Sequence, residues 1–116
     1  ANWENALASI QNEGALGESP SDYARAFARL ENHYFQNAGF LDCDGWILRE
    51  RRHIEHIPAT IIQGRYDMIC PPQAAWSLAQ GWANSELKMV PLAGHALSEP
   101  GISEALVRVM DSLRRI

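Results

Sequence analysis

A strand–helix–strand pattern in the second half of the chain is the feature that most limits its fold. Residues 59–63 form a short apolar run rich in β-branched side chains, bounded by Pro58 and Gly64. A helical pattern opens at Pro71, and a second apolar run follows at 87–90. Strands joined through one helix pair in parallel, with both carboxyl ends at the same edge of the sheet. The pattern predicts an α/β fold built on a parallel sheet.

Helical periodicity accounts for most of the remaining chain. Residues 1–10 are expected to be the tail of a helix, and further helices are expected at about 19–37, 46–52, 71–83 and 102–113. The last of these has a clean amphipathic stripe, because its apolar side chains recur at helical spacing. In the short helix at 46–52, Arg49, Arg51 and Arg52 are expected to form a solvated basic edge.

Asp67 and His95 follow the two predicted strands and are 28 residues apart. His95 comes after Gly94, a small residue at which the backbone can turn tightly. An acid and an imidazole at neighbouring strand ends are the arrangement in which a carboxylate orients a catalytic base. The spacing alone supports the alternative equally well: Asp67 would cap the next helix and His95 would be an ordinary loop histidine.

The sequence contains no Gly-x-Ser-x-Gly motif, which presents the nucleophile in serine hydrolases with a parallel sheet. Ser98 follows the histidine closely, but it lacks the flanking glycines that expose a catalytic hydroxyl. The sequence therefore offers an acid and a base without a nucleophile.

Composition narrows the classes of partner. The chain has 116 residues, a net charge of −4 and no basic cluster, so we expect no nucleic-acid partner. No apolar stretch approaches the roughly 20 residues that span a bilayer, so we expect no membrane partner. Cys43, Cys70 and the four histidines lack the spacing of metal ligands, so neither a metal nor another cofactor is predicted. Reduced thiols and a cytoplasmic location are the expectation.

Several stretches of the sequence are similar to one enzyme family. Segment 57–71, IPATIIQGRYDMICP, resembles the acid-bearing segment of the α/β-hydrolase superfamily and, more narrowly, that of the proline iminopeptidases. Three further stretches agree with that family: LENHYF at 30–35, AGHALSEPG at 93–101, and Trp3-Glu4 at 3–4. The resemblance covers essentially the whole chain, as the C-terminal part of a longer enzyme.

The resemblance implies a fold and two catalytic roles. Residues 1–50 would be the end of a helical cap domain, and residues 51–116 would be the last part of the α/β-hydrolase core. Asp67 would be the acid of a catalytic triad and His95 its general base. The serine would lie upstream of Ala1.

The resemblance also implies an amine-binding role for Glu31 and, less directly, for Glu4. These carboxylates would hold the free amine of an N-terminal proline. Glu31 falls on the apolar stripe of its predicted helix beside Phe27, where a desolvated carboxylate could select a cation. The alternatives remain open: Glu31 could be a surface acid paired with Arg25 or Arg29, and Glu4 a solvated helix acid.

The expected function is therefore that of a serine-type exopeptidase that releases N-terminal proline from peptides. The 116-residue chain alone is expected to be inactive, and an uncovered sheet edge favours self-association or pairing with the N-terminal part of the enzyme. The alternatives are another α/β-hydrolase, such as an esterase, an epoxide hydrolase or a dehalogenase, and a catalytically inactive fragment.

Overall fold

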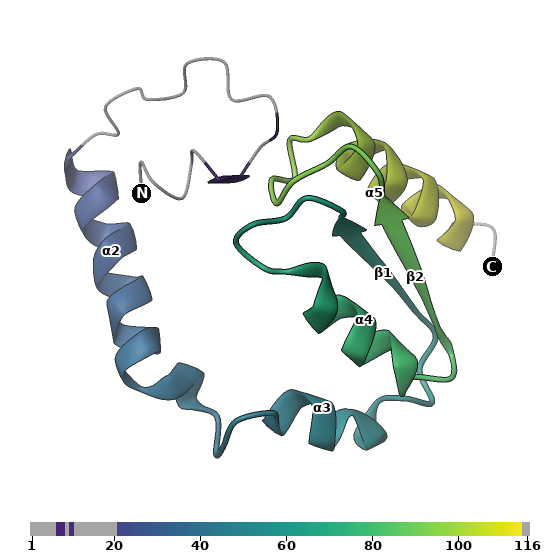
Figure 1. Ribbon diagram of the computed structural model, residues 1–116, viewed down its shortest axis with the longest axis horizontal. Coiled ribbons are helices and arrows are strands. Elements are labelled where there is room, and N and C mark those ends of the chain that lie inside the picture. The colour runs from purple at the N-terminus through teal and green to yellow at the C-terminus, as the bar shows by residue number, and fades with distance from the viewer. Residues whose placement is uncertain (1–6, 9, 11–20, 115–116) are drawn as a thin grey trace.

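The computed structural model describes residues 7–8, 10 and 21–114 as a mixed helical and parallel-sheet structure (Figure 1). Its elements are, in chain order, α2 (Ser21–Gln36), the 3-10 segment η1 (Ala38–Phe40), α3 (Trp46–Glu50), the 3-10 segment η2 (Arg51–His53), β1 (Ala59–Gly64), α4 (Pro72–Gln80), β2 (Ser85–Val90) and α5 (Pro100–Leu113). The predicted α/β class is confirmed at this level.

The sheet consists of β1 and β2, which pair in parallel. The register places Ala59 opposite Ser85 and Gly64 opposite Val90, so both strands end together. α4 connects the strands and α5 follows the second, and Figure 1 shows the sheet between these two helices. α4 ends at Gln80, earlier than predicted, because the chain turns at once into a β2 that begins two residues sooner than expected.

Little of this structure is buried. Among the described residues the buried apolar side chains are those of Ala75, Ala93 and Ile102. The accessible surface of the chain is 9045 Å², whereas a compact monomer of 13.0 kDa exposes about 6,300 Å². Exposed aromatic and aliphatic side chains occur on α2, α4 and α5. The elements therefore leave apolar surface uncovered, and they form an open arrangement in which α2 lies apart from the sheet (Figure 1).

The chain leaves α2 through a short left-handed turn. Ala38, Gly39 and Phe40 have φ angles of 49°, 64° and 59°. The Phe40 ring packs edge-on against Tyr34, with ring centroids 5.4 Å apart. This turn ends α2 within one residue of the predicted position and directs the chain toward α3.

The predicted solvated basic edge is wrong for Arg51. Arg51 is half-buried, and its Nη1 donates to the carbonyls of Ser77 and Leu78 at 3.3 and 3.4 Å. These carbonyls lie in the last turn of α4, where a cation also complements the helix dipole. Arg51 thereby fastens η2 to the carboxyl end of α4.

Two further side chains hold the segment before β1. The indole N–H of Trp82 donates to the Ile57 carbonyl at 2.8 Å, and the Asn84 side-chain amide donates to the Glu55 carbonyl at 3.1 Å. Both donors come from the turn between α4 and β2. The chain therefore enters β1 along a fixed path beside the strand's partner.

The contact between Gly81 and Arg51 predicts the cost of a substitution. A Cβ at Gly81 would lie 1.7 Å from Arg51 Nη2, so Gly81→Ala must displace the guanidinium and its hydrogen bonds. We expect Gly81→Ala to lower the free energy of unfolding by about 1 kcal/mol, measured by urea denaturation. In an Arg51→Ala background the same substitution should cost nothing. Equal costs in both backgrounds would contradict this account.

Candidate active site

The candidate site lies where the two strands end side by side. A Cβ built on Gly64 would lie 1.9 Å from the Gly94 carbonyl oxygen and 2.7 Å from that of Ala93. Beyond β1, the N–H of Tyr66 donates to the Ala93 carbonyl at 2.9 Å. Gly64 is therefore required by the close approach of two backbones, which brings together the loops that carry Asp67 and His95. Gly94 does not have a left-handed φ, so the expected tight turn there does not depend on that conformation.

The Asp67 carboxylate accepts four hydrogen bonds and is 6% exposed. Its Oδ1 accepts the backbone N–H groups of Ile69 and Cys70 at 3.0 and 2.8 Å. Its Oδ2 faces Nδ1 of His95 at 2.9 Å and accepts from Nε2 of Gln63 at 3.1 Å. All four directions around the carboxylate are thus occupied by donors.

These contacts fix the charge of Asp67 and the tautomer of His95. Burial opposes ionisation of Asp67, but the donors from Cys70, His95 and Ile69 outweigh it, so the pKa of the carboxyl lies below its usual value. An ionised carboxylate only accepts hydrogen bonds, so Nδ1 of His95 must carry the proton. In the neutral imidazole the lone pair is then on Nε2, which is where a general base needs it.

His95 is presented outward from a loop that is anchored at its backbone. Its side chain is 41% exposed. The N–H groups of His95 and Ala96 both donate to the Ala8 carbonyl, each at 2.8 Å. Nδ1 of the ring contacts the Asp67 carboxylate. Among the described residues no hydrogen-bond partner is found for Nε2.

Gln63 is a contributor to the site that sequence reasoning missed. Its side-chain amide donates to Asp67 and also to the carbonyl of Cys70 at 3.1 Å, so it links the last turn of the loop to β1. An amide side chain at the end of a mostly apolar strand was the available signal. A cavity of about 230 Å³ borders Gln63, Asp67 and His95 and is also lined by Leu97 of the loop.

Comparison with known proteins identifies relatives of this chain. No family model matches the chain. A proline iminopeptidase of Arabidopsis thaliana is 47% identical over 116 residues, a match that covers 98% of this chain and 30% of that protein. Proline iminopeptidases of Xylella fastidiosa (strain Temecula1) and Xanthomonas citri are 44% and 40% identical and match 95% and 94% of this chain, in each case 36% of the relative.

Over nearly its whole length the chain is similar to proline iminopeptidases. The predicted resemblance is therefore confirmed, and it extends over nearly the whole chain. The chain spans about a third of the length of the curated relatives it matches.

The two glutamates with a predicted amine-binding role are placed differently from the Asp67–His95 pair. Glu31 is half-buried on α2, and Figure 1 shows α2 well apart from the carboxyl ends of β1 and β2. On the same helix Phe27 is 38% exposed, and Phe35 is 76% exposed. Glu4 lies outside the described residues. The structure thus brings Asp67 and His95 together but does not bring Glu31 to them.

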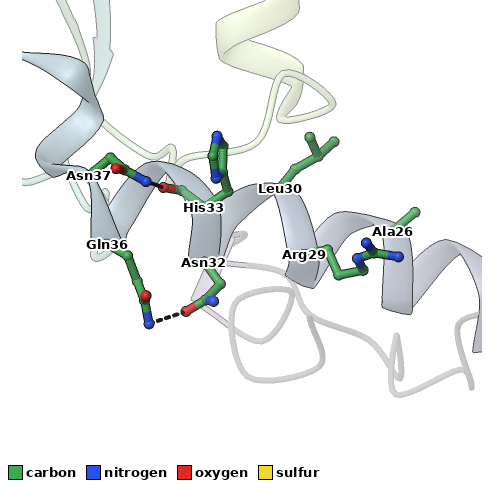
Figure 2. Close-up of a pocket in the computed structure, with 7 residues that line it drawn as sticks. All are labelled: Ala26, Arg29, Leu30, Asn32, His33, Gln36 and Asn37. Atoms are coloured by element: carbon green, nitrogen blue, oxygen red, sulfur yellow. Dashed lines mark hydrogen bonds between the residues drawn. The ribbon is translucent and has the colours of Figure 1, made fainter.

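A second cavity, of about 640 Å³, lies along α2 and is lined by residues of that helix and the residue after it: Ala26, Arg29, Leu30, Asn32, His33, Gln36 and Asn37. Figure 2 shows their side chains projecting in different directions from a single helix. Two hydrogen bonds, from Gln36 to Asn32 and from Asn37 to the His33 carbonyl, already engage its polar groups. This hollow lacks a convergent set of groups on which to build a ligand site.

Cys70 lies three residues after Asp67 and is exposed. The pKa of Cys70 lies above its usual value. The larger cause is partial shielding of the thiol from water, and the smaller is the negative charge of Asp67. Nucleophilic cysteines have lowered pKa values, so this site does not activate Cys70 as a nucleophile.

Neither a metal site nor a membrane-spanning helix is found in the described part of the chain. There, no three His, Cys, Asp or Glu side chains gather as a metal site would require. None of the helices in residues 7–8 and 21–114 has the length and apolar character needed to cross a bilayer.

The close approach at Gly64 predicts a large effect of one methyl group. In Gly64→Ala the added carbon meets backbone oxygens that cannot rotate away. We expect a loss of at least about 2 kcal/mol in the free energy of unfolding, measured by urea denaturation. Thr60→Ala, at an exposed position of the same strand, is the matched control and should change little. A Gly64→Ala chain as stable as this control would contradict the close approach.

The lowered pKa of Asp67 predicts a dependence of stability on acid. Because the folded-state pKa lies below the ordinary value of 3.8, the stabilisation from the ionised carboxylate is lost as pH falls through the folded-state pKa. The difference in unfolding free energy between the unsubstituted chain and Asp67→Asn should therefore shrink between about pH 5 and pH 2. Thermal unfolding at fixed pH steps measures it. A difference that grows toward low pH would contradict the assignment.

Proposed function

We propose that this chain supplies the acid and the base of a serine-type peptidase that releases N-terminal proline from peptides. The observation that carries the proposal is the hydrogen bond between a buried Asp67 and an exposed His95 at two adjacent strand ends, in a chain similar to proline iminopeptidases. The nucleophilic serine is supplied by a part of the enzyme outside this sequence.

In this reaction Nε2 of His95 takes the proton from the serine hydroxyl as its oxygen attacks the scissile carbonyl. The imidazolium that forms is stabilised by the ionised Asp67 at Nδ1. It then gives the proton to the departing amine. A water molecule, activated by the same nitrogen, releases proline from the acyl-enzyme. Gln63 keeps the Asp67 carboxylate oriented through both steps.

Glu31 and Glu4 are proposed to anchor the secondary ammonium of the terminal proline. The half-burial of Glu31 on a helix with aromatic side chains supports this, since a partly desolvated carboxylate attracts a cation strongly. Residues 1–50 would belong to the cap domain and residues 51–116 to the α/β-hydrolase core. The protein is expected to be cytoplasmic, with neither nucleic acid nor membrane as a partner.

The uncovered apolar surface supports pairing of this chain with the rest of the enzyme or with itself. A cavity of about 530 Å³ runs between β1 and α5 and is lined by Pro58, Ile62, Leu106, Val109 and Met110, among others. Apolar side chains at a sheet edge are the usual place for a further strand or helix to pack.

The test uses a chimera in which this chain replaces the matching third of the Xanthomonas citri proline iminopeptidase. We expect release of proline from prolyl amides, and we expect Asp67→Asn to lower kcat on the order of 10⁴-fold and His95→Ala to abolish turnover. Glu31→Gln should lower kcat/KM for prolyl substrates by about 100-fold. Asp22→Asn, an exposed acid on the same helix, is the matched control.

Substrate choice separates the proposal from its alternative within the superfamily. Efficient hydrolysis of acyl esters, with no preference for an N-terminal proline and no effect of Glu31→Gln, would favour an esterase-type enzyme. The 116-residue chain by itself is expected to release no proline, and release by the purified chain would contradict the assignment of the nucleophile to another part of the enzyme.

A further inference from the structure

Glu99 is a buried acid that the proposed reaction does not use. It is 4% exposed and immediately precedes Pro100, where α5 begins. Its Oε1 accepts the backbone N–H of Ile10 at 2.8 Å, across 89 residues of sequence. A buried carboxylate is costly unless hydrogen bonds compensate for lost water, so this contact indicates a specific task.

The backbone near Ile10 also holds the backbone of His95. The Ala8 carbonyl accepts the N–H groups of both His95 and Ala96, each at 2.8 Å. Ala8 and Ile10 therefore contact the two ends of the loop that runs from His95 to Glu99. These contacts comprise three hydrogen bonds, one of which has a carboxylate as its acceptor.

We propose that Glu99 is a positioning residue that, with Ile10 and Ala8, holds the His95 loop and so fixes the backbone from which the imidazole projects. A second tie, from Ser103 Oγ to the Leu97 carbonyl at 2.7 Å, holds the middle of the loop to α5. That tie does not reach His95. The contacts of Ala8 and Ile10 set the direction in which His95 leaves the sheet, and their catalytic consequence rests on the proposed function.

The first test is amide hydrogen exchange on the 116-residue chain. In Glu99→Ala, loss of one charge-assisted hydrogen bond should speed exchange of the Ile10, His95 and Ala96 amides by about tenfold. Amides of the β1–β2 ladder should exchange at their original rates. Glu99→Gln retains an acceptor oxygen and should restore most of the protection. Glu104→Ala removes an exposed acid from the same helix and should change none of these amides.

A second variant removes the other partner of the same bond. Ile10→Pro has no backbone N–H to donate, so it should speed exchange of the His95 and Ala96 amides as Glu99→Ala does. The double variant should be no worse than either single one. In the chimera, Glu99→Ala should lower kcat by about tenfold with little change in KM, because a displaced base acts after binding.

These experiments test the positioning role of Glu99 separately from the proposed peptidase function. Faster exchange in every element, or unchanged exchange at His95 and Ala96 in both Glu99→Ala and Ile10→Pro, would overturn the positioning role. An unsubstituted chimera that releases no proline would count against the proposed function, while the local exchange pattern would still support the positioning role.

Discussion

The backbone contact between Gly64 and Gly94 is the constraint on which the rest of the site depends. With any residue other than glycine at position 64, the ends of β1 and β2 could not come so close. A Cβ there would lie 1.9 Å from the Gly94 carbonyl oxygen. From this contact the chain diverges into two loops, one with Asp67 and the other with His95. The 2.9 Å distance between Oδ2 and Nδ1 is therefore set by the sheet and not by flexible side chains.

Hydrogen bonds to Asp67 keep its buried carboxylate ionised. A carboxyl as buried as Asp67 would by itself resist ionisation. Two backbone N–H groups and the Gln63 amide are directed at it, so the charge persists and the imidazole is held with its proton on Nδ1. The same hydrogen bonds thus stabilise the loop and hold the imidazole in the tautomer that its proposed role as a base requires.

Sequence reasoning could predict the pairing of Asp67 with His95 because parallel strands joined by one helix always present their carboxyl ends at one edge. It could not predict the tasks of Arg51, Gln63 or Glu99. Each depends on which backbone groups come within reach of a long side chain, and that is decided by tertiary packing. The charged sequence neighbours of Arg51 predict a solvated side chain, yet its guanidinium binds the carbonyls at the end of α4.

The amine-binding role proposed for Glu31 would require elements other than those that form the Asp67–His95 site. α2 is separated from the sheet, and its aromatic side chains are exposed, so an amine pocket would need further elements to close it. The chain matches about a third of its relatives' length, and the uncovered apolar surface of α2 and α5 agrees with further packing partners. The contact between Asp67 and His95, in contrast, is already formed within the described residues.

The tautomer of His95 is the most direct test of the interaction between Asp67 and His95. Nitrogen-15 NMR of the imidazole, in the 116-residue chain above the pH at which the ring is protonated, distinguishes a proton on Nδ1 from one on Nε2. We expect a single tautomer with the proton on Nδ1. In Asp67→Asn this preference for one tautomer should be lost. A proton on Nε2, or a mixture that Asp67→Asn leaves unchanged, would contradict the claim that Asp67 prepares His95 as a base.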